Sequence, residues 1–381
     1  MTNNYSPPRP DVAVFIPSYE GGGAERVALF LSEGLAASGY RTDLVVSKTK
    51  GALKDVPLEG PRKVHLNAIT EFLALPGYLG YLRRERPRIV VGILHTATLT
   101  VGLGRLRFND VKTVVSLRNA LIRNPKDMWW FRRWFGFGVE RFVYHRCDVV
   151  KAVSKGLARE VEEIFRFPHG TVPTVYNPVG EIDAGDTNID PRDEPLFDRP
   201  VVLGAGRLVP QKNFPLLIRS FAAAANDTDA NLVIIGEGPQ RADLLALADS
   251  LGVASRVFLP GWRPNPRHYM KRARVFAMSS LFEGFGVVCA EALSTGVAIV
   301  STRCPHGPAE ILGEGAYGRL VPNDDQEAMT AALKAELQSV DIGHTERLAE
   351  RADWLKQFQP DYVVDRYREI IEAQIGPPTH S

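Results

Sequence analysis

Two carboxylates lie eight residues apart in the segment Glu283-Gly-Phe-Gly-Val-Val-Cys-Ala-Glu291. The largely apolar run 274–282 before them predicts a buried strand and its exit loop, and the residues from Gly286 onward predict the first turns of a helix. Glycines let backbone amides approach a ligand, and a helix start presents free N–H groups to anions. Two carboxylates beside such a helix start suit a polyhydroxylated ligand that carries phosphate, such as a sugar nucleotide. Taken alone, this segment is explained equally well by the alternative, an ordinary strand–helix unit in which a Glu on the helix is solvated.

A pair of cations opens the second half of the chain, in Gly204-Ala-Gly-Arg-Leu-Val-Pro-Gln-Lys-Asn-Phe214. Arg207 and Lys212 flank the exit of a predicted strand. Arg can fork onto phosphate oxygens, and Lys adds a point charge. Together they can neutralise a diphosphate leaving group without a divalent metal, so we expect no metal site. The alternative is two solvated cations at a strand end.

A glycine run, Gly21-Gly-Gly-Ala-Glu-Arg26, lies between the first predicted strand (12–16) and the first predicted helix (24–38). Three glycines allow backbone conformations that are closed to other residues, and the helix start adds N–H donors. The run is not the G-x-G-x-x-G dinucleotide fingerprint. Its position favours a cradle over a phosphate or a sugar, and the alternative is a flexible turn.

The elements that must hold these residues alternate between strand and helix along the whole chain, which indicates parallel α/β architecture. A length of 381 residues favours two domains. We expect an N-terminal Rossmann-like domain over 1–182, an acidic linker over 183–198 and a second Rossmann-like domain over 199–360. The C-terminal residues 361–381 should form a helix that packs back on the first domain, and a tail. Open parallel sheets bind ligands at the carboxyl ends of their strands, so we expect the site in a cleft between the two sheets.

Composition describes an ordinary globular chain, with 45% hydrophobic and 24% charged residues. Residues 1–190 hold 26 Lys/Arg against 20 Asp/Glu, and residues 191–381 hold 20 against 24, so the first half favours an anionic partner. The three cysteines have no metal-ligand spacing and fit a reduced, cytoplasmic compartment. We find no signal-peptide pattern and no apolar run of the roughly 20 residues that a spanning helix needs. Any membrane contact should be peripheral.

Seven blocks of the chain together resemble the retaining glycosyltransferases of family four, which have the GT-B fold. They follow the family order and span nearly the whole sequence. The blocks are Gly-Gly-Ala-Glu-Arg (22–26), Ala-Val-Ser (152–154), Tyr-Asn-Pro-Val (176–179), Gly-Arg-Leu with Gln-Lys-Asn-Phe (206–214), Gly-Glu-Gly-Pro (236–239), Glu-Gly-Phe-Gly with Glu (283–291) and Gly-Pro-Ala-Glu-Ile-Leu (307–312).

The resemblance implies a role for each matching residue. Arg207 and Lys212 match the pair that holds the donor diphosphate, Glu283 matches the Glu that contacts the donor sugar, and Glu291 matches the Glu that binds the ribose. The remaining implied donor contacts are Gly22 and Gly23 on the diphosphate, Gly284, Phe285, Gly286 and Val287 along sugar and phosphate, and Gly261 and Arg263 near the base.

One departure from the family pattern concerns Arg118. Many members have a His after the strand represented here by 113–117, whereas this chain has Arg118-Asn119. Arg118 can stabilise a phosphate or orient the acceptor, but it cannot shuttle protons at neutral pH. A branch of the family does carry Arg-Asn here. His95, at the end of an apolar strand, is a further candidate catalytic residue, and a structural His is an equal alternative.

The resemblance implies transfer of a sugar, with retention, from a nucleoside-diphosphate sugar (UDP above all) to a hydroxyl of a lipid-linked or cell-surface glycan. The nucleotide sugar is a co-substrate, and no cofactor is expected. Two other classes of protein remain open: a UDP-sugar 2-epimerase-like isomerase with the same architecture, and a non-catalytic sugar-nucleotide-binding protein.

The segment 118–146 combines aromatic and basic side chains, with seven Arg/Lys against two acids. Trp and Arg together suit a membrane interface with anionic lipids. We therefore expect peripheral attachment to the inner face of the cytoplasmic membrane, and the alternative is an aromatic core helix with solvated Arg residues. Nucleic acid is a poor partner, because the basic residues form no longer run or known motif.

Overall fold

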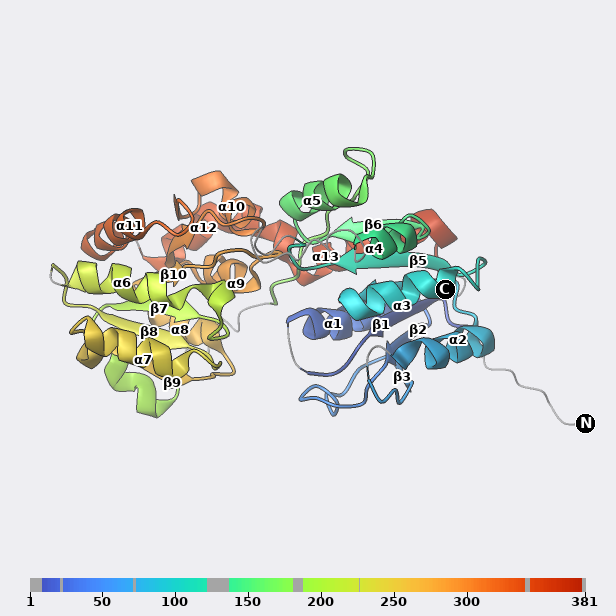
Figure 1. The fold of residues 1–381 in the computed structure, drawn as a ribbon, viewed down its shortest axis with the longest axis horizontal. Coiled ribbons are helices and arrows are strands. Elements are labelled where there is room, and N and C mark those ends of the chain that lie inside the picture. The colour runs from blue at the N-terminus through green and yellow to red at the C-terminus, as the bar shows by residue number, and fades with distance from the viewer. Residues whose placement is uncertain are drawn as a thin grey trace, which may run out of the picture. The chain divides into compact units, whose positions relative to one another are not determined.

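The computed structural model describes residues 9–20, 23–70, 73–121, 137–180, 188–225, 227–339 and 343–378. The chain divides into two compact units, Met1–Pro178 with Pro360–Ser381, and Val179–Gln359. Each unit is a six-stranded parallel sheet with helices packed against it (Figure 1). This confirms the predicted α/β class with two Rossmann-like sheets.

The sheet of the first unit has the order β3-β2-β1-β4-β5-β6. Its strands are β1 (Val12–Ile16), β2 (Thr42–Val46), β3 (Arg62–His65), β4 (Ile89–Ile93), β5 (Lys112–Leu117) and β6 (Val149–Ala152). The helices are α1 (Gly23–Ala37), α2 (Ala74–Glu85), α3 (His95–Arg105), α4 (Phe137–Tyr144), α5 (Lys155–Phe165) and α13 (Pro360–Ile375). Helices α2, α3 and α4 pack side by side, and α1 packs against α13.

The second sheet has the order β12-β11-β10-β7-β8-β9. Its strands are β7 (Val201–Ala205), β8 (Asn231–Ile235), β9 (Val257–Gly261), β10 (Val275–Met278), β11 (Ala298–Thr302) and β12 (Arg319–Val321). The α-helices are α6 (Phe214–Ala225), α7 (Arg241–Ser250), α8 (Pro266–Arg272), α9 (Val287–Thr295), α10 (Pro308–Ile311), α11 (Gln326–Gln338) and α12 (His344–Leu355). Short 3-10 turns are η3 (Pro191–Phe197), η4 (Pro210–Lys212), η5 (Ala254–Arg256), η6 (Gly313–Gly315) and η7 (Lys356–Phe358).

The inner strands of both sheets are apolar runs that are buried along their whole length, such as Val12–Ile16 and Val275–Met278. Helices on both faces of a parallel sheet produce this pattern, because neither face is left to water. The edge strand β3, with the sequence Arg-Lys-Val-His, is instead partly exposed. The apolar centre of each sheet therefore holds the strand ends in place, and the loops beyond those ends carry the polar residues.

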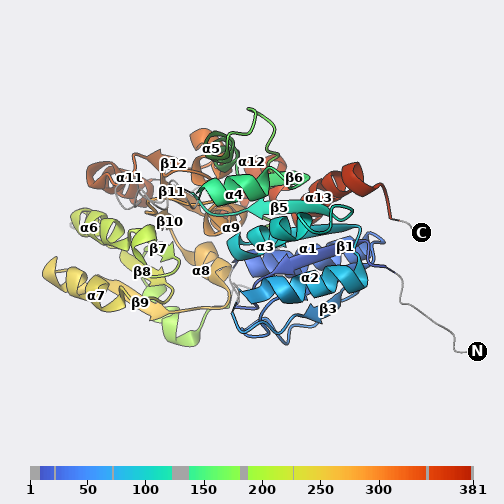
Figure 2. The same cartoon turned by 45° about the vertical axis from the view of Figure 1, so that its right-hand side comes forward.

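The C-terminal helix α13 belongs to the first unit. Figures 1 and 2 show it, in red, beside β5 and β6, although it follows them by about two hundred residues in the chain. The hydroxyl of Tyr367 lies 3.4 Å from the Ser116 hydroxyl on β5. Val363, Tyr367 and Ile371 recur at helical spacing and are buried in the core of this unit.

Part of the acidic segment 183–198 is folded onto the second unit. Helix η3 carries a buried carboxylate, Asp193, which is paired with Arg263. The preceding residues 181–187 lie outside the described residues. A second ion pair, from Glu194 to Arg272, also ties η3 to the second unit.

Candidate functional site

The second sheet changes its winding direction between β7 and β10. From β7 the chain continues to β8 and β9 on one side, and from β10 it continues to β11 and β12 on the other. The loops that leave these two neighbouring strands therefore diverge, and parallel sheets bind ligands at the crevice that this creates. Arg207 and Lys212 follow β7, and Glu283 follows β10. The three predicted residues thus share one edge of one sheet.

Lys212 and Glu283 form an ion pair at this switch point. The distance from Lys212 Nζ to Glu283 Oε1 is 2.6 Å, and the side chains are only 15% and 9% exposed. Ser280 Oγ donates to the same oxygen at 2.8 Å. Glu283 Oε2 has no hydrogen-bond partner in the part of the chain that is described. Because an ammonium group has three donors, Lys212 can hold Glu283 and a phosphate oxygen together.

Three hydrogen bonds to backbone carbonyl oxygens hold the two loops against each other. The Leu281 amide donates to Gln211 O at 2.8 Å, Gln211 Nε2 donates to Phe282 O at 2.9 Å, and Ser279 Oγ donates to Lys212 O at 2.8 Å. We did not predict these positioning residues from the sequence. The only sign of them in the sequence is that polar side chains occur within the two motifs. No spacing rule connects residues that lie about 70 positions apart.

Helix α9 begins directly beside Glu283. Its N-cap is Gly286 with φ 86°, a left-handed conformation that favours glycine. The Cys289 amide donates to Gly286 O at 2.8 Å, which leaves the amides of Val287 and Val288 as the first-turn donors that can meet an anion. The Phe285 side chain is buried against Phe358, with ring centroids 5.8 Å apart, so only the backbone of Phe285 can serve a ligand. Glu291 lies further along α9 and is partly exposed.

A third loop, after β11, closes on the Glu283 loop. The Glu283 amide donates to Pro305 O at 3.1 Å. Gly307 has φ +81°, and a Cβ atom built there would lie 1.7 Å from Phe285 O. Only glycine permits this approach, so Gly307 determines how close the two loops can come.

Arg207 has a different environment from Lys212. It is exposed, and its guanidinium makes no hydrogen bond or ion pair with the described residues. Its partner-free side chain agrees with the predicted diphosphate contact, which stays a prediction, since exposed cations without partners are common.

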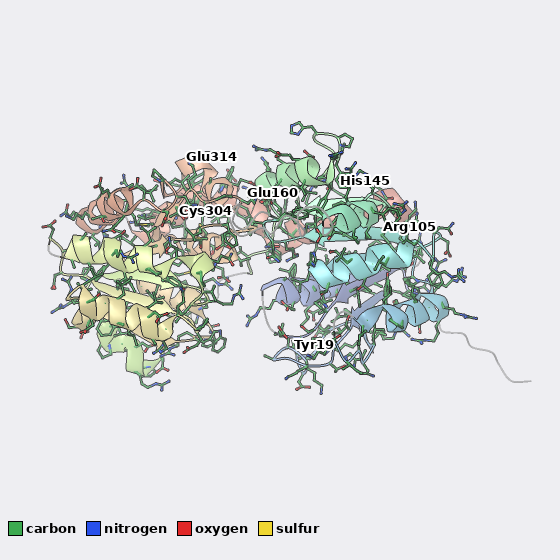
Figure 3. All side chains as sticks on the ribbon, in the orientation of Figure 1. Tyr19, Arg105, His145, Glu160, Cys304 and Glu314 are labelled. Carbon is green, nitrogen blue, oxygen red and sulfur yellow. The ribbon has the colours of Figure 1, made fainter. Side chains whose placement is uncertain are left out.

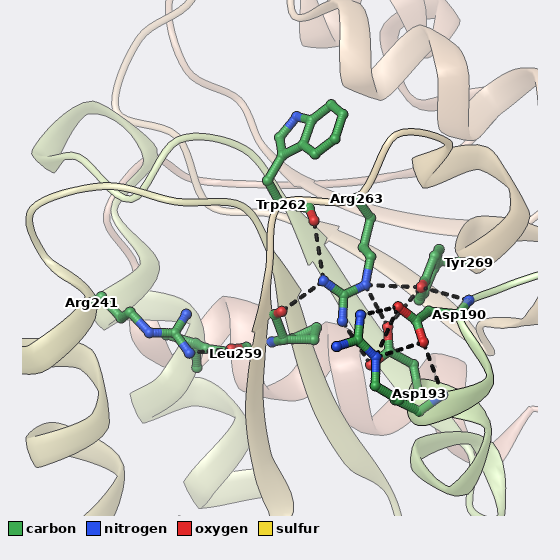
Figure 4. A network of polar contacts seen from close by, with 9 residues as sticks. Asp190, Asp193, Arg241, Leu259, Trp262, Arg263 and Tyr269 are labelled. Carbon is green, nitrogen blue, oxygen red and sulfur yellow. Dashed lines mark hydrogen bonds and ion pairs between the residues drawn. The ribbon is translucent and has the colours of Figure 1, made fainter.

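Arg263 is predicted to lie near the base of the nucleotide. Most of its N–H groups already donate hydrogen bonds to other residues (Figure 4). Nε and Nη2 meet the two Asp193 oxygens at 2.7 and 2.9 Å, and Nη1 donates to the carbonyl oxygens of Pro260 and Trp262. Hydrogen bonding to Asp193 raises the pKa of Arg263. Arg263 thereby fastens η3 to the end of β9. Base contacts by Arg263 and by Gly261, which ends β9 with φ +94°, stay predictions.

One Asp-x-Asp sequence, Asp227-Thr-Asp229, does occur in the chain. It precedes β8, at the amino edge of the sheet and opposite to Glu283, and its carboxylates pair with Lys334 and Arg199. No group of three His, Cys, Asp or Glu residues that could hold a metal ion occurs among the described residues. Metal independence stays a prediction.

The first sheet has its own switch point, between β1 and β4. Gly22, predicted to contact the diphosphate, lies outside the described residues, while Gly23 begins α1 and is exposed. Tyr19, beyond the end of β1 and labelled in Figure 3, is buried, and its hydroxyl lies 3.1 Å from His65 Nε2. His95 begins α3 just after β4, and its Nε2 lies 2.8 Å from Glu140 Oε1.

Arg118, just after β5, belongs to a buried cationic cluster with Lys151 and Tyr367. Arg118 is 9% exposed, and within the described ranges its Nε and Nη2 have no hydrogen-bond partner. Lys151 is fully buried, donates to Val175 O at 3.0 Å and has Nζ 4.6 Å from the centre of the Tyr367 ring. Burial lowers the pKa of Lys151 to about 8. Burial alone would raise the pKa of Tyr367, but the charges of Lys151 and Arg118 outweigh it and lower that pKa to about 7.

The aromatic-basic segment predicted to meet a membrane is described only in part, because residues 122–136 lie outside the described residues. Of the rest, α4 exposes Val139 and Phe142, and the Arg146 guanidinium lies over the Phe142 ring. Within the ranges that the structure covers, no helix is long and apolar enough to cross a membrane.

Known proteins resemble both units of the chain. The family model described as "Glycosyl transferases group 1" matches residues 186–353, and "Glycosyltransferase Family 4" matches residues 21–180. The N-acetylgalactosamine-N,N'-diacetylbacillosaminyl-diphospho-undecaprenol 4-alpha-N-acetylgalactosaminyltransferase of Campylobacter jejuni is 30% identical over 346 residues, which cover 86% of this chain and 90% of that protein. The lipopolysaccharide core biosynthesis glycosyltransferase LpsE of Rhizobium meliloti is 27% identical over 360 residues, with 93% and 96% covered.

Among solved structures, Anabaena Alr3699/HepE in complex with UDP and glucose superimposes with a TM-score of 0.78 at 15% identity, covering 96% of this chain and all of that one. At this identity the likeness concerns the fold alone. This likeness in fold agrees with the two family models, with the Campylobacter relative and with the two parallel sheets described above. The chain belongs to the family 4 glycosyltransferases and has the GT-B fold.

Proposed function

We propose that this glycosyltransferase moves a sugar from a UDP-sugar to a hydroxyl of a lipid-linked saccharide, with retention of the anomeric configuration and without a metal ion. The observation that carries the proposal is the Lys212–Glu283 pair beside the start of α9, at the switch point of the second sheet. It combines a carboxylate for sugar hydroxyls with a cation and free amides for phosphate. The UDP bound to the Anabaena structure supports the choice of base.

Each group has a defined task in the proposed reaction. Arg207, Lys212 and the first-turn amides of α9 stabilise the charge that develops on the leaving diphosphate. Glu283 accepts hydrogen bonds from donor-sugar hydroxyls through Oε2, and Glu291 binds the ribose. The bond from the anomeric carbon to the phosphate oxygen breaks while the acceptor oxygen bonds to the same face. The acceptor's hydroxyl proton passes to the leaving diphosphate, so the enzyme needs no carboxylate nucleophile.

The first unit would supply the acceptor side. Arg118 and Lys151 place two buried cations together, and no carboxylate pairs with either in the described part of the unit. Buried charges are costly unless they are paired, so such a cluster suits an anionic group of the ligand. The diphosphate of a lipid-linked acceptor is such a group, and the name of the Campylobacter relative includes a diphospho-undecaprenol.

The exposed apolar residues of α4 and the basic residues around them suit a peripheral contact with anionic lipid, which would bring the enzyme to such an acceptor. Co-sedimentation tests this part separately. The protein should pellet with phosphatidylglycerol vesicles at low salt and remain in solution with phosphatidylcholine vesicles. Equal behaviour with both would contradict it.

A donor panel tests the central proposal. Thermal unfolding is measured with UDP-, GDP- and ADP-sugars, because a ligand that binds only the folded protein raises its stability by mass action. We expect UDP-sugars to give the largest increase, also in the presence of EDTA. The responding sugar is then incubated with an undecaprenyl diphosphate-linked saccharide, and NMR of the product should show the donor's anomeric configuration. Inversion, dependence on a metal or conversion of the donor without an acceptor would contradict the proposal.

A further inference from the structure

His95 and Glu140 form a hydrogen-bonded pair at the switch point of the first sheet. His95 is the first residue of α3, two residues after the last residue of β4, and Glu140 lies in the first turn of α4. The distance from His95 Nε2 to Glu140 Oε1 is 2.8 Å. The His95 side chain is 49% exposed, whereas that of Glu140 is 14% exposed. One nitrogen of an accessible imidazole is thus held by a largely buried carboxylate.

The carboxylate determines which ring nitrogen carries the proton. A carboxylate only accepts hydrogen bonds, so Nε2 must be the donor, and the neutral ring then has its lone pair on Nδ1. His95 Nδ1 has no hydrogen-bond partner in the described part of the chain. Nδ1 of this half-exposed side chain is therefore an acceptor with a fixed direction, and it suits a hydroxyl group of a ligand.

Two unfavourable features surround the pair. Leu94, the residue before His95, has φ 77° and ψ 152°, a region that is almost restricted to glycine and costs about 1–3 kcal/mol. Glu140 Oε2 is buried and has no hydrogen-bond partner among the described residues, which is also destabilising. Strain of this kind gathers at binding and catalytic sites. Stability of the fold does not account for a pair built in this way.

A second pair in the same unit, His169 and Glu162, is a useful contrast. His169 Nδ1 lies 3.1 Å from Glu162 Oε2, and the His169 side chain is 86% exposed. Glu162 Oε1 also accepts from the Val172 amide at 2.9 Å, so this carboxylate already fastens a loop. Helix α5 leads from the carboxyl edge of the sheet back to the opposite edge, where His169 lies. Local structure accounts for this pair, and it is far from the switch point.

We propose that His95 Nδ1 accepts a hydrogen bond from a hydroxyl of the acceptor saccharide, and that Glu140 is the positioning residue that holds the imidazole in the required tautomer. This inference rests on the proposed function, because it assigns His95 to the acceptor of that reaction. No bond to His95 is made or broken, since the proton of the attacking hydroxyl leaves with the diphosphate. His95 orients the saccharide, and Glu140 acts only through His95.

The variant Glu140→Gln separates positioning from folding. Its amide has the shape of the carboxylate, and with its NH2 group toward the ring it donates to Nε2, so that the ring proton moves to Nδ1 and the ligand acceptor becomes a donor. We expect the KM for an undecaprenyl diphosphate-linked disaccharide to rise about tenfold, as for the loss of one hydrogen bond. The KM for the UDP-sugar, and UDP release by hydrolysis without an acceptor, should not change. Proton–nitrogen correlation spectra of the imidazole nitrogens should show the exchanged tautomer.

Two further variants complete the test. His95→Gln removes the acceptor nitrogen and should raise the same KM about as much, whereas the matched control His169→Gln should leave every parameter at the wild-type value. An exchanged tautomer without a change in acceptor KM, or a normal acceptor KM in His95→Gln, would overturn the inference while leaving the proposed function intact. A wild-type enzyme that transfers no sugar from any UDP-sugar to this acceptor would instead overturn the proposed function, and this inference with it.

Discussion

The two sheets have the same winding order, but they balance charge differently near the carboxyl ends of their strands. In the second unit, Lys212 lies against the carboxylate of Glu283. In the first unit, Lys151 and Arg118 are buried with a tyrosine between α13 and the sheet, and their charges lower the pKa of Tyr367. A carboxylate is ionised over the whole physiological pH range, whereas a tyrosine balances the charge of a nearby cation only where its pKa is lowered. In the second unit the cation is already paired with a carboxylate. In the first unit, cation donors remain without hydrogen-bond partners among the described residues and can bind an anion.

The largest effect that we predict tests the packing of the second switch point. Gly307→Ala combines a left-handed φ with a Cβ atom 1.7 Å from Phe285 O, so we expect a loss of about 3 kcal/mol in unfolding free energy. A thermal scan should show a midpoint lower by about 6–12 °C. Gly170→Ala in the first unit is the matched control, since Gly170 has φ +78° with nothing within 4 Å of the added atom. Equal losses in the two variants would mean that the close approach of the loops is unimportant.

Next in size is the effect of Glu283 on turnover. Glu283→Ala removes a charge-assisted hydrogen bond to the reacting sugar, and we expect kcat to fall about 100-fold. Steady-state kinetics with the donor found in the panel measures it. Glu291→Ala should mainly weaken donor binding and leave kcat near the wild-type value. Mild and equal effects of both substitutions would mean that this segment is an ordinary strand–helix unit without a role in donor binding.

A smaller effect distinguishes the two donor-site cations. Lys212→Ala and Arg207→Ala should each weaken UDP-sugar binding about tenfold by calorimetry, because each removes a charged phosphate contact. Only Lys212→Ala should also lower the unfolding free energy, since it leaves Glu283 unpaired in a largely buried place. A double-mutant cycle of Lys212 and Glu283 should give a coupling of at least about 0.5 kcal/mol. Additive losses would contradict the ion pair as the organising feature.

The smallest effect concerns Tyr367 and is spectroscopic. Its pKa falls from the ordinary 10 to about 7, so between these pH values the unfolded chain binds more protons and stability should rise with pH. Absorbance at 295 nm should show one tyrosine of the folded protein ionising below pH 9, and Tyr367→Phe should abolish that step. Tyr144→Phe is the control, because burial raises the pKa of Tyr144. A folded protein without an early step would show that Lys151 and Arg118 are balanced by other groups.

The sequence predicted most of the fold because the information is local. Inner strands such as 12–16 and 113–117 are short apolar runs, and their predicted bounds agree with β1 and, to within one residue, with β5. The edge strand β3 was missed, since Arg-Lys-Val-His lacks the apolar pattern of a buried strand. The sequence predicts a linker where the turn η3 folds, because an acidic run gives no sign that Asp193 will meet Arg263 some 70 residues later.

By itself, the sequence determined the family, the two parallel sheets and the residue types at the strand ends, because periodicity and short motifs are properties of neighbouring residues. The tertiary structure alone decided the pairings: Lys212 with Glu283, His95 with Glu140, and Tyr367 with Lys151. Each joins residues that lie 45 or more positions apart in the chain. Such contacts depend on strand order and on the direction in which each loop leaves its sheet. Neither property is written in any single stretch of sequence.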